Sequence, residues 1–268
     1  MVSFPNCKIN LGLHITQKRA DGYHDLETIF YPINLKDVIE IIPSENFSFN
    51  ISGLTIEGTQ NDNLCLKAYH LLKKFFPYLP PINMWLHKSI PMGAGLGGGS
   101  ADGAFTLRLL NDKFHLNLSI TQLLGYASQL GSDCPFFIIN KPCFASGRGE
   151  ILEPFELDLS DYSFVIVYPK IHISTAWAFS QIIPKHPTKY LKEVIKQPIE
   201  TWQHELKNDF EEAALKKFPE LKEIKENLYR AGALYVSMSG SGSAFYGIFK
   251  KNNIGTFHFS DNFETFML

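Results

Sequence analysis

Five glycines fall within seven positions, residues 93–99, directly before a stretch with the spacing of a helix. Glycine loses more backbone freedom on folding than any other residue, so this cluster needs a physical reason. We expect positive φ angles and main-chain N–H groups that approach an anion at the helix N-terminus, where phosphate binds well. The cluster consists of Gly93, Gly95, Gly97, Gly98 and Gly99.

Two familiar nucleotide-binding patterns fit this loop only in part. Gly93, Gly95 and Gly98 satisfy the dinucleotide pattern, which also needs an acid about 20 residues later at the end of a second parallel strand. Asp112 is at that distance, but a helical pattern leads up to it and another helix follows. A P-loop needs a lysine where this chain has Gly99. The cation that balances the phosphate charge must therefore come from elsewhere in the chain, and a simple turn would need fewer glycines.

Composition narrows the class of partner. The chain has 268 residues, 45% of them hydrophobic, and a net charge of −2 without a block of like charges. This composition is typical of a globular protein and lacks the basic patch of a nucleic-acid binder. No apolar run is long enough for a membrane span or a leader, so we expect a cytoplasmic protein. We also expect it to bind small molecules and to be a monomer or weak homodimer. The cysteines lack metal-like spacing and are expected to be free thiols: Cys7, Cys65, Cys134 and Cys143.

The first half of the chain reads as a mixture of strands and helices. Residues 8–15 alternate between apolar and polar, which predicts a half-buried strand with Lys8 and Asn10 on one side. We expect further strands over residues 26–34, 38–42 and 82–87 and a helix over 64–75 that ends before Pro77. Ser100 is predicted to cap the helix that follows the glycine loop, and Ser119 with Gln122 predicts a capping box.

The second half has a different order of elements. We expect a strand over residues 164–168, helices over 175–182, 206–217 and 219–230, and two strands, 234–238 and 244–249. The last two flank a second loop of small residues, 239–243. The order of expected strands and helices changes near residue 150, so we predict two α+β domains, residues 1–150 and 151–268.

Three separated segments together resemble the motifs of the GHMP kinases, whose glycine-serine loop binds ATP phosphates without a P-loop lysine: residues 5–13, 91–101 and 239–244. Residues 18–28 and 131–137 further resemble the segments that mark one group within the family, and the likeness covers nearly the whole chain. The resemblance implies an α+β, two-domain architecture, with a ribosomal-protein-S5-like N-terminal domain and a ferredoxin-like C-terminal domain.

The resemblance also implies an activity. That group uses ATP and Mg²⁺ to phosphorylate the 2-hydroxyl of a methylerythritol moiety that carries cytidine diphosphate, a step of the non-mevalonate route to isoprenoids. A tertiary hydroxyl is a poor acid, so a carboxylate that accepts its proton and an ammonium that counters charge would both help. By similarity these are Asp133 and Lys8, which taken alone would pass for a turn acid and a strand lysine.

The acceptor site follows from the same resemblance. Tyr23 is expected to stack on cytosine and His24 to bind its polar edge, with Phe179 or Trp177 as the second aromatic ring. Asn10 would hold Asp133 or the acceptor hydroxyl. The second small-residue loop would close over the diphosphate through Gly240, Ser241 and Gly242.

On the ATP side, the backbone N–H groups before and within the first helical turn should bind the phosphates, with the Ser100 hydroxyl near Mg²⁺. Asn63 and Lys88 resemble contacts to the adenine region. Asp102 would repel a nearby phosphate and should point away from it. The expected ATP-binding segment is Pro91, Met92, Gly93, Ala94, Gly95, Leu96, Gly97, Gly98, Gly99, Ser100 and Ala101.

Three alternatives stay open at the level of sequence. A GHMP kinase for another alcohol, such as mevalonate, homoserine or a sugar, would have no cytosine for Tyr23 and His24 to bind. A non-catalytic nucleotide-binding protein on this fold would be expected to lack Lys8 or Asp133, and both are present. A dinucleotide-dependent oxidoreductase would bind a nicotinamide cofactor rather than ATP. Residues 180–230 match no motif, so their role is open.

Overall fold

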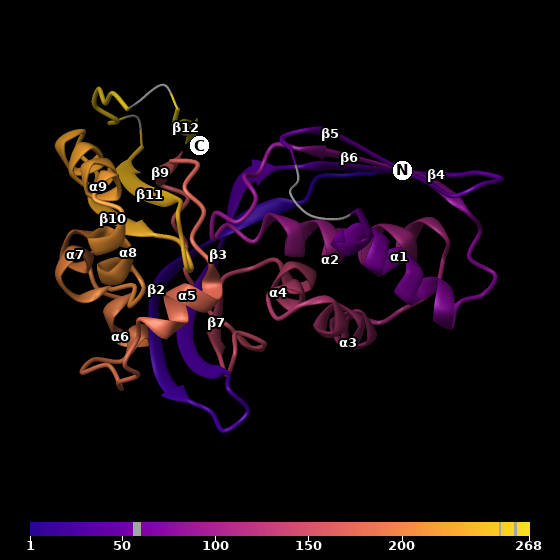
Figure 1. Ribbon diagram of the computed structural model, residues 1–268, viewed down its shortest axis with the longest axis horizontal. Coiled ribbons are helices and arrows are strands. Elements are labelled where there is room, and N and C mark those ends of the chain that lie inside the picture. Colours follow the sequence, from indigo (N-terminus) through magenta and orange to yellow (C-terminus); the bar gives the residue numbers. More distant parts are fainter. Residues whose placement is uncertain (56–59, 252, 260–261) are drawn as a thin grey trace. The chain divides into compact units, whose positions relative to one another are not determined.

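The computed structural model describes residues 1–55, 60–251, 253–259 and 262–268, and its contacts divide the chain into two compact units (Figure 1). Unit 1 consists of residues 1–8, 32–92 and 97–141, and unit 2 of residues 9–31, 93–96 and 142–268. The chain therefore passes from unit 1 to unit 2 between residues 8 and 9. It also does so in the glycine loop, where residues 93–96 belong to unit 2 and the residues on either side belong to unit 1. The expected domain boundary near residue 150 stays a prediction.

Unit 1 contains a four-stranded sheet in the order β1-β4-β6-β5, in which β5 and β6 run parallel and the other pairs antiparallel. In Figure 1 the helices α1 and α2 lie along one side of this sheet. The two helices also pack against each other, and α2 contacts α3 and α4. The elements are β1 (Val2–Ser3), β4 (Val38–Pro43), β5 (Ser48–Gly53), η1 (Gln60–Asp62), α1 (Leu64–Phe75), β6 (Ile82–Lys88), α2 (Gly98–Lys113), α3 (Ile120–Leu130) and α4 (Cys134–Ile139).

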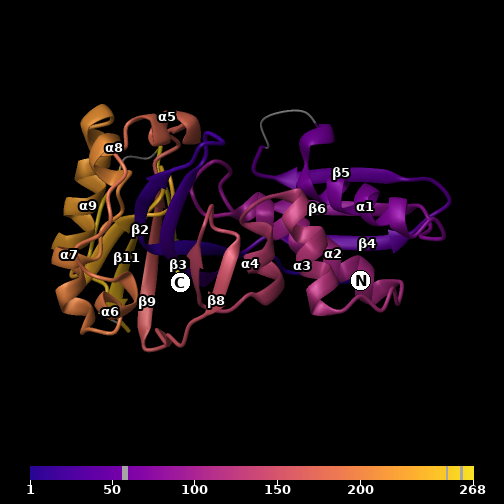
Figure 2. The ribbon, with the colours of Figure 1, turned by 90° about the horizontal axis from the view of Figure 1, so that it is seen from below.

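The other two sheets lie wholly or mostly in unit 2, with the orders β2-β3-β7-β8 and β10-β11-β9-β12. The helices α7 and α9 pack against the second of these sheets, and α8 packs against α9 (Figure 2). The elements are β2 (Asn6–Lys18), β3 (His24–Lys36), β7 (Cys143–Ser146), β8 (Ile151–Pro154), β9 (Tyr162–Tyr168), α5 (Thr175–Ser180), α6 (Leu191–Val194), η2 (Ile199–Thr201), α7 (Trp202–Glu205), α8 (Glu211–Lys217), α9 (Glu220–Arg230), β10 (Tyr235–Met238), β11 (Phe245–Lys250) and β12 (Glu264–Met267).

Local sequence signals predicted several elements correctly. The helix α1 spans the expected residues 64–75, and α3 has the complete Ser119–Gln122 capping box. The described chain between α2 and α3 contains no strand, which removes the second parallel strand that a dinucleotide site requires. Among the described residues the four cysteines form no disulfide, and all four are buried.

Three expectations were wrong for reasons of tertiary structure. The strand β2 is not half-buried, because its residues 6–13 are buried on both faces. Ser100 does not cap α2, since the helix begins at Gly98 with Gly97 as its N-cap in the left-handed region. The helix expected from residue 206 begins at Glu211, because residues 207–209 hydrogen-bond to Leu13 in β2 instead.

Candidate active site

Lys8 and Asp133 meet in unit 1 although 125 positions separate them in sequence (133 − 8). The Lys8 Nζ lies 3.4 Å from Asp133 Oδ2, and the two side chains are 5% and 33% exposed. Lys8 comes from the buried part of β2, whereas Asp133 stands at the N-cap position of α4, where Pro135 follows in the first turn. A buried ammonium thus contacts a carboxylate that remains accessible to a small molecule.

The start of α2 lies against this pair. Gly97 has a φ of 72°, and a Cβ added to it would lie 3.1 Å from Lys8 Cε and 3.0 Å from Phe137 Cζ. Glycine at this position therefore makes room for the stem of Lys8. No side chain among the described residues caps the N-terminus of α2, so the first-turn N–H groups of the helix can bind an anion there.

Ser100 lies in the first turn of α2, next to Cys134. Burial raises the pKa of the Cys134 thiol to about 12, and a hydrogen bond with Ser100 partly offsets this rise. Cys134 is the residue after Asp133, so the Ser100 hydroxyl lies close to the chain that carries the carboxylate. Ser100 is therefore placed where an oxygen could face a metal-bound phosphate, which keeps it as the candidate Mg²⁺ contact.

The remaining glycines of the loop have different neighbours. Gly95 has a φ of 78°, and a Cβ there would lie 1.9 Å from the Ser239 carbonyl oxygen, inside unit 2. A Cβ on Gly98 would lie 2.8 Å from Ile90 Cγ2. Both glycines are thus required by other parts of the chain itself, so the expectation that the whole cluster serves a ligand is too broad.

Gly93 and Gly99 are less constrained. Gly93 has a φ of 65°, but its added Cβ would meet His172 only at 3.6 Å. Gly99 lies outside the left-handed region, and its Cβ would meet Met92 Cε at 3.5 Å, an ordinary contact. Neither backbone conformation nor packing requires glycine at position 99, so a bound ligand is the best explanation for Gly99.

Lys88 is not placed to contact adenine as the resemblance implied. It is 1% exposed, its Nζ donates to Asp102 Oδ2 at 2.7 Å, and it also donates to Asp37 Oδ2. The ammonium is therefore held by two carboxylates inside unit 1. Asp102 points toward this lysine, and burial is the largest cause that raises its pKa well above the ordinary value. Asn63 caps α1 by accepting a hydrogen bond from Cys65 N at 2.9 Å, and its contact with adenine stays a prediction.

The small-residue loop 239–243 is held in unit 2 by buried hydrogen bonds that the sequence did not reveal. Asn208 Nδ2 donates to the carbonyl oxygens of Met238 and Gly240, at 2.8 Å each. Ser239 Oγ donates to Gly95 O at 2.9 Å, so this loop and residues 93–96 pack together within the unit. Asn208 stands among other polar residues between Leu206 and Phe210, so the sequence did not single it out.

Asn10 lies beside the same loop. Its Nδ2 donates to Thr28 Oγ1 at 3.0 Å, and a Cβ added to Gly240 would lie 3.4 Å from Asn10 Oδ1. Ser241 Oγ lies 3.2 Å from Thr175 Oγ1. Asn10 belongs to unit 2 and Asp133 to unit 1, so their predicted contact stays a prediction.

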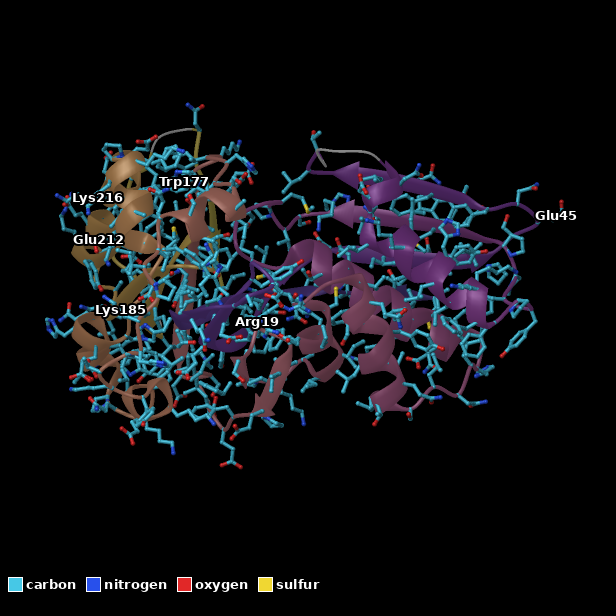
Figure 3. The ribbon with its side chains drawn as sticks, turned by 60° about the horizontal axis from the view of Figure 1, so that its bottom comes forward. Arg19, Glu45, Trp177, Lys185, Glu212 and Lys216 are labelled. Atoms are coloured by element: carbon cyan, nitrogen blue, oxygen red, sulfur yellow. The ribbon has the colours of Figure 1, made fainter. Side chains whose placement is uncertain are left out.

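The structure shows which of the two expected aromatic residues lies beside His24. His24 stacks on Phe179, with ring centroids 4.9 Å apart and an interplanar angle of 19°. Trp177, labelled in Figure 3, instead packs against Phe218 and lies 4.0 Å below Lys217 Nζ. Of the two expected candidates, Phe179 is thus the one beside His24.

Tyr23 is the residue before His24 and is 56% exposed. The Arg148 guanidinium carbon lies 4.7 Å from the centroid of its ring. The sequence indicated only a change in the order of elements near residue 150, so this contact was missed. One flat face of Tyr23 is thus already next to a cation.

Among the residues that the structure describes, no helix is long and apolar enough to cross a membrane. Within the same residues, His, Cys, Asp and Glu side chains form no cluster of three that could hold a metal ion.

Comparison with known proteins identifies the class. Residues 63–141 match the GHMP kinase N-terminal domain, and residues 190–255 match the GHMP kinase C-terminal domain. A protein from Azobacteroides pseudotrichonymphae named 4-diphosphocytidyl-2-C-methyl-D-erythritol kinase is 52% identical over 263 residues, which cover 97% of this chain and 98% of the relative. A protein of the same name from Bacteroides fragilis is 52% identical over 253 residues, which cover 93% and 92%.

A solved structure agrees with these relatives. The crystal structure of a 4-(cytidine 5'-diphospho)-2C-methyl-D-erythritol kinase matches with a TM-score of 0.80 and 31% identity, over 92% of this chain and 90% of the other. The chain belongs to the GHMP kinase family, and within it to the group of 4-diphosphocytidyl-2-C-methyl-D-erythritol kinases. The expected α+β, two-domain GHMP kinase fold is confirmed, and ATP is the co-substrate that this family implies.

Proposed function

We propose that this chain transfers the γ-phosphoryl group of ATP to the 2-hydroxyl of 4-diphosphocytidyl-2-C-methyl-D-erythritol, a step in the non-mevalonate synthesis of isoprenoid precursors. The observation that carries the proposal is the match to relatives of that name over nearly their whole length. The contact between Lys8 and Asp133 supports it, since a protein that only bound nucleotides would have no need of that pair.

The transfer step uses Lys8 and Asp133 in different ways. Phosphoryl transfer depends mainly on positioning and on neutralising the charge of the transferring oxygens. Asp133 is exposed enough to accept a hydrogen bond from the acceptor hydroxyl, and its carboxylate takes the proton as the new P–O bond forms and the bond from the γ-phosphorus to the leaving ADP oxygen breaks. Lys8 is held in place by burial, and its ammonium counters the negative charge of the hydroxyl oxygen and of the γ-phosphate.

The phosphates of ATP are assigned to the N–H groups at the start of α2. This assignment rests on the uncapped helix N-terminus and on Gly99, where a side chain is absent without a steric reason from the rest of the chain. Mg²⁺ keeps most of its water and phosphate ligands and needs only one or two protein oxygens, a demand that the Ser100 hydroxyl fits. When bound, the ion neutralises charge on the phosphate oxygens.

The acceptor is assigned to unit 2. His24, stacked on Phe179, can present its ring edge to cytosine, and Tyr23 offers an exposed ring for stacking. Gly240, Ser241 and Gly242 are assigned to the diphosphate by the family resemblance, and the two hydrogen bonds from Asn208 support the loop that contains them.

The test is an ATP-consumption assay in which the diphosphocytidyl substrate is compared with mevalonate, homoserine and galactose. We expect turnover with the diphosphocytidyl substrate and background rates with the others. Turnover with one of the other alcohols alone would overturn the acceptor assignment. ATP binding without turnover on any acceptor would favour a nucleotide-binding protein on this fold.

A further inference from the structure

A group of three buried charges lies behind the glycine loop in unit 1 and has no part in the proposed chemistry. Lys88 ends β6, Asp37 precedes β4, and Asp102 lies in the first turns of α2. The side chains of Lys88 and Asp37 are 0% exposed and that of Asp102 is 4% exposed. We call these three residues the buried triad.

The buried triad is connected to both ends of the glycine loop. Asp37 Oδ1 accepts hydrogen bonds from Ser89 N at 2.6 Å and from Ile90 N at 2.8 Å. Through Lys88 the same aspartate is linked to Asp102 on α2. The chain between Ile90 and Asp102 contains every glycine of the loop, so one buried cation ties the entry of the loop to its exit.

Steric contact adds to this connection. A Cβ added to Gly98, the first residue of α2, would lie 2.8 Å from Ile90 Cγ2 and 3.4 Å from Lys88 Nζ. The first turn of the helix is therefore seated directly against Ile90 and the lysine. A displacement of any triad member would move the N–H groups of this turn.

Stability alone is a poor explanation for the buried triad. A buried ion pair commonly contributes no more to stability than well-packed apolar residues would. Here two carboxylates share a single lysine, and Asp102 Oδ1 has no hydrogen-bond partner among the described residues. Because burying these groups costs desolvation free energy, the buried triad is better explained by the position in which it holds the first turn of α2.

We infer that Lys88, Asp37 and Asp102 are positioning residues that fix the first turn of α2 against residues 89–90, so that the helix N–H groups are already arranged for the phosphates of ATP. The inference rests on the proposed function, since it concerns how the proposed ATP site is built. It assigns the triad to ATP affinity and leaves the acceptor site unaffected. Lys88 thus serves the nucleotide through the loop rather than by touching it.

The test compares Asp37→Asn, Lys88→Met and Asp102→Asn. Because a misplacement of about 1 Å can cost about 100-fold, we expect Asp37→Asn and Lys88→Met to raise the KM for ATP by about tenfold. The KM for the acceptor should stay within about twofold of the wild-type value, since the acceptor residues lie elsewhere. Asp102→Asn should have a smaller effect on the KM for ATP, because its one amide oxygen can still accept the hydrogen bond from Lys88. Asp37→Asn leaves one oxygen for bonds that Asp37 accepts on two, from Lys88 and from the N–H groups of Ser89 and Ile90.

A double variant tests whether Asp37 and Lys88 affect the KM for ATP through each other or independently. If Lys88 acts through Asp37, the double variant Asp37→Asn with Lys88→Met should raise the KM for ATP no more than the worse single variant. Binding of a fluorescent ATP analogue without acceptor gives a readout that does not require turnover. Failure of the proposed function would appear in the wild-type protein, whereas failure of this inference would appear only in the ratio of variant to wild type.

Met84→Ala is the matched control. Met84 is fully buried in the same strand β6 but bonds to neither end of the loop, so its loss should lower the unfolding temperature without changing the KM for ATP. If Lys88→Met fails to fold, Asp37→Asn and Asp102→Asn carry the test. Equal increases in both KM values, or a lower unfolding temperature with unchanged ATP affinity in Asp37→Asn, would overturn the inference.

Discussion

The two units hold their functional segments by different means. In unit 1 the start of α2 packs against the buried triad, in which Lys88 lies between Asp37 and Asp102. In unit 2 the loop 239–243 is held by neutral groups, namely the amide of Asn208, the hydroxyls of Ser239 and Ser243, and its own backbone. Unit 1 also contains the Lys8–Asp133 pair, whereas the proposed acceptor residues of unit 2 are aromatic rings, an amide and small residues.

This contrast matches the two proposed tasks. Phosphoryl transfer develops negative charge, which fixed cations and oriented N–H groups stabilise best. Recognition of a base depends on stacking and on hydrogen bonds to its edge, which neutral groups provide at a lower cost of desolvation. Substitutions in unit 1 should therefore change turnover or ATP affinity, and substitutions in unit 2 should change affinity for the acceptor.

The largest effect is expected for the Lys8–Asp133 pair. Asp133→Asn removes the proton acceptor and Lys8→Ala removes the fixed ammonium, so each should lower kcat by about 10² to 10⁴. The KM values should change much less. Steady-state kinetics with both substrates measures this, with Lys18→Ala, an exposed lysine at the end of the same strand β2, as the control. Wild-type turnover in Asp133→Asn would remove that residue from the chemistry.

Two glycines of one loop should respond in opposite ways. A side chain on Gly95 must adopt a positive φ and would overlap the Ser239 carbonyl oxygen, so Gly95→Ala should lower the free energy of unfolding by about 2–5 kcal/mol. Gly99→Ala has space and lies in a helix, so it should raise stability by up to about 1 kcal/mol. Urea unfolding and titration with an ATP analogue test both variants.

The two glycine variants separate structure from ligand approach. Gly99→Ala should weaken ATP binding despite its greater stability, because the new methyl group stands where we place the phosphates. Unchanged ATP affinity in Gly99→Ala would move the phosphates away from this turn. A stable and fully active Gly95→Ala would contradict the close packing of the two loops in unit 2.

Local signals explain what could be predicted from the sequence. The start and end of α1 and the capping box of α3 depend on residues within a few positions of each other, and both were correct. Motifs likewise indicated Lys8, Asp133 and His24. The structure brings the first two together and places the third against Phe179.

What the sequence could not predict depends on contacts between distant positions. Lys88 lies 51 positions from Asp37 and 14 from Asp102, and only tertiary packing turns these three charges into one buried group. The segment before α8 has apolar residues at helical spacing, yet it hydrogen-bonds to Leu13 instead. The five glycines look alike in sequence, but only Gly95, Gly97 and Gly98 are required by close neighbours in the chain, which are Lys8, Ile90, Phe137 and Ser239.

A smaller effect is expected at the aromatic residues of unit 2. His24→Phe keeps a ring to stack on Phe179 but removes the polar edge, and Phe179→Leu keeps apolar bulk but removes the stacking. Each should raise the KM for the acceptor by about 10- to 100-fold, equivalent to about 1–3 kcal/mol, with little change in the KM for ATP. The measurement is steady-state kinetics with each substrate varied in turn.

Competition by free nucleotides sharpens this test. The wild-type protein should bind cytidine nucleotides more tightly than uridine nucleotides, because His24 would read the amino group and ring nitrogen of cytosine. His24→Phe should lose most of this preference. Equal affinity of the wild-type protein for both nucleotides would contradict edge recognition by His24 and leave only stacking in unit 2.

At neutral pH the smallest effect is that of the buried thiols, because it appears only at alkaline pH. Burial raises the pKa of Cys7 to about 12 and that of Cys143 to about 11, and it also raises the pKa of Cys65. An unfolded thiol loses its proton near pH 8.5, so above that pH the unfolded state binds fewer protons than the folded state and stability falls as the pH rises. Each buried thiol should lower the free energy of unfolding by up to about 1.4 kcal/mol per pH unit.

This alkaline loss should fall unequally on the two units. Unit 1 contains Cys7, Cys65 and Cys134, whereas unit 2 contains Cys143. Unit 1 should therefore open first as the pH rises from 8 to 10, and alkylation followed by mass spectrometry should label its cysteines before Cys143. Earlier labelling of Cys143 would contradict this order. It would mean that the buried triad stabilises unit 1 by more free energy than the deprotonation of its thiols removes.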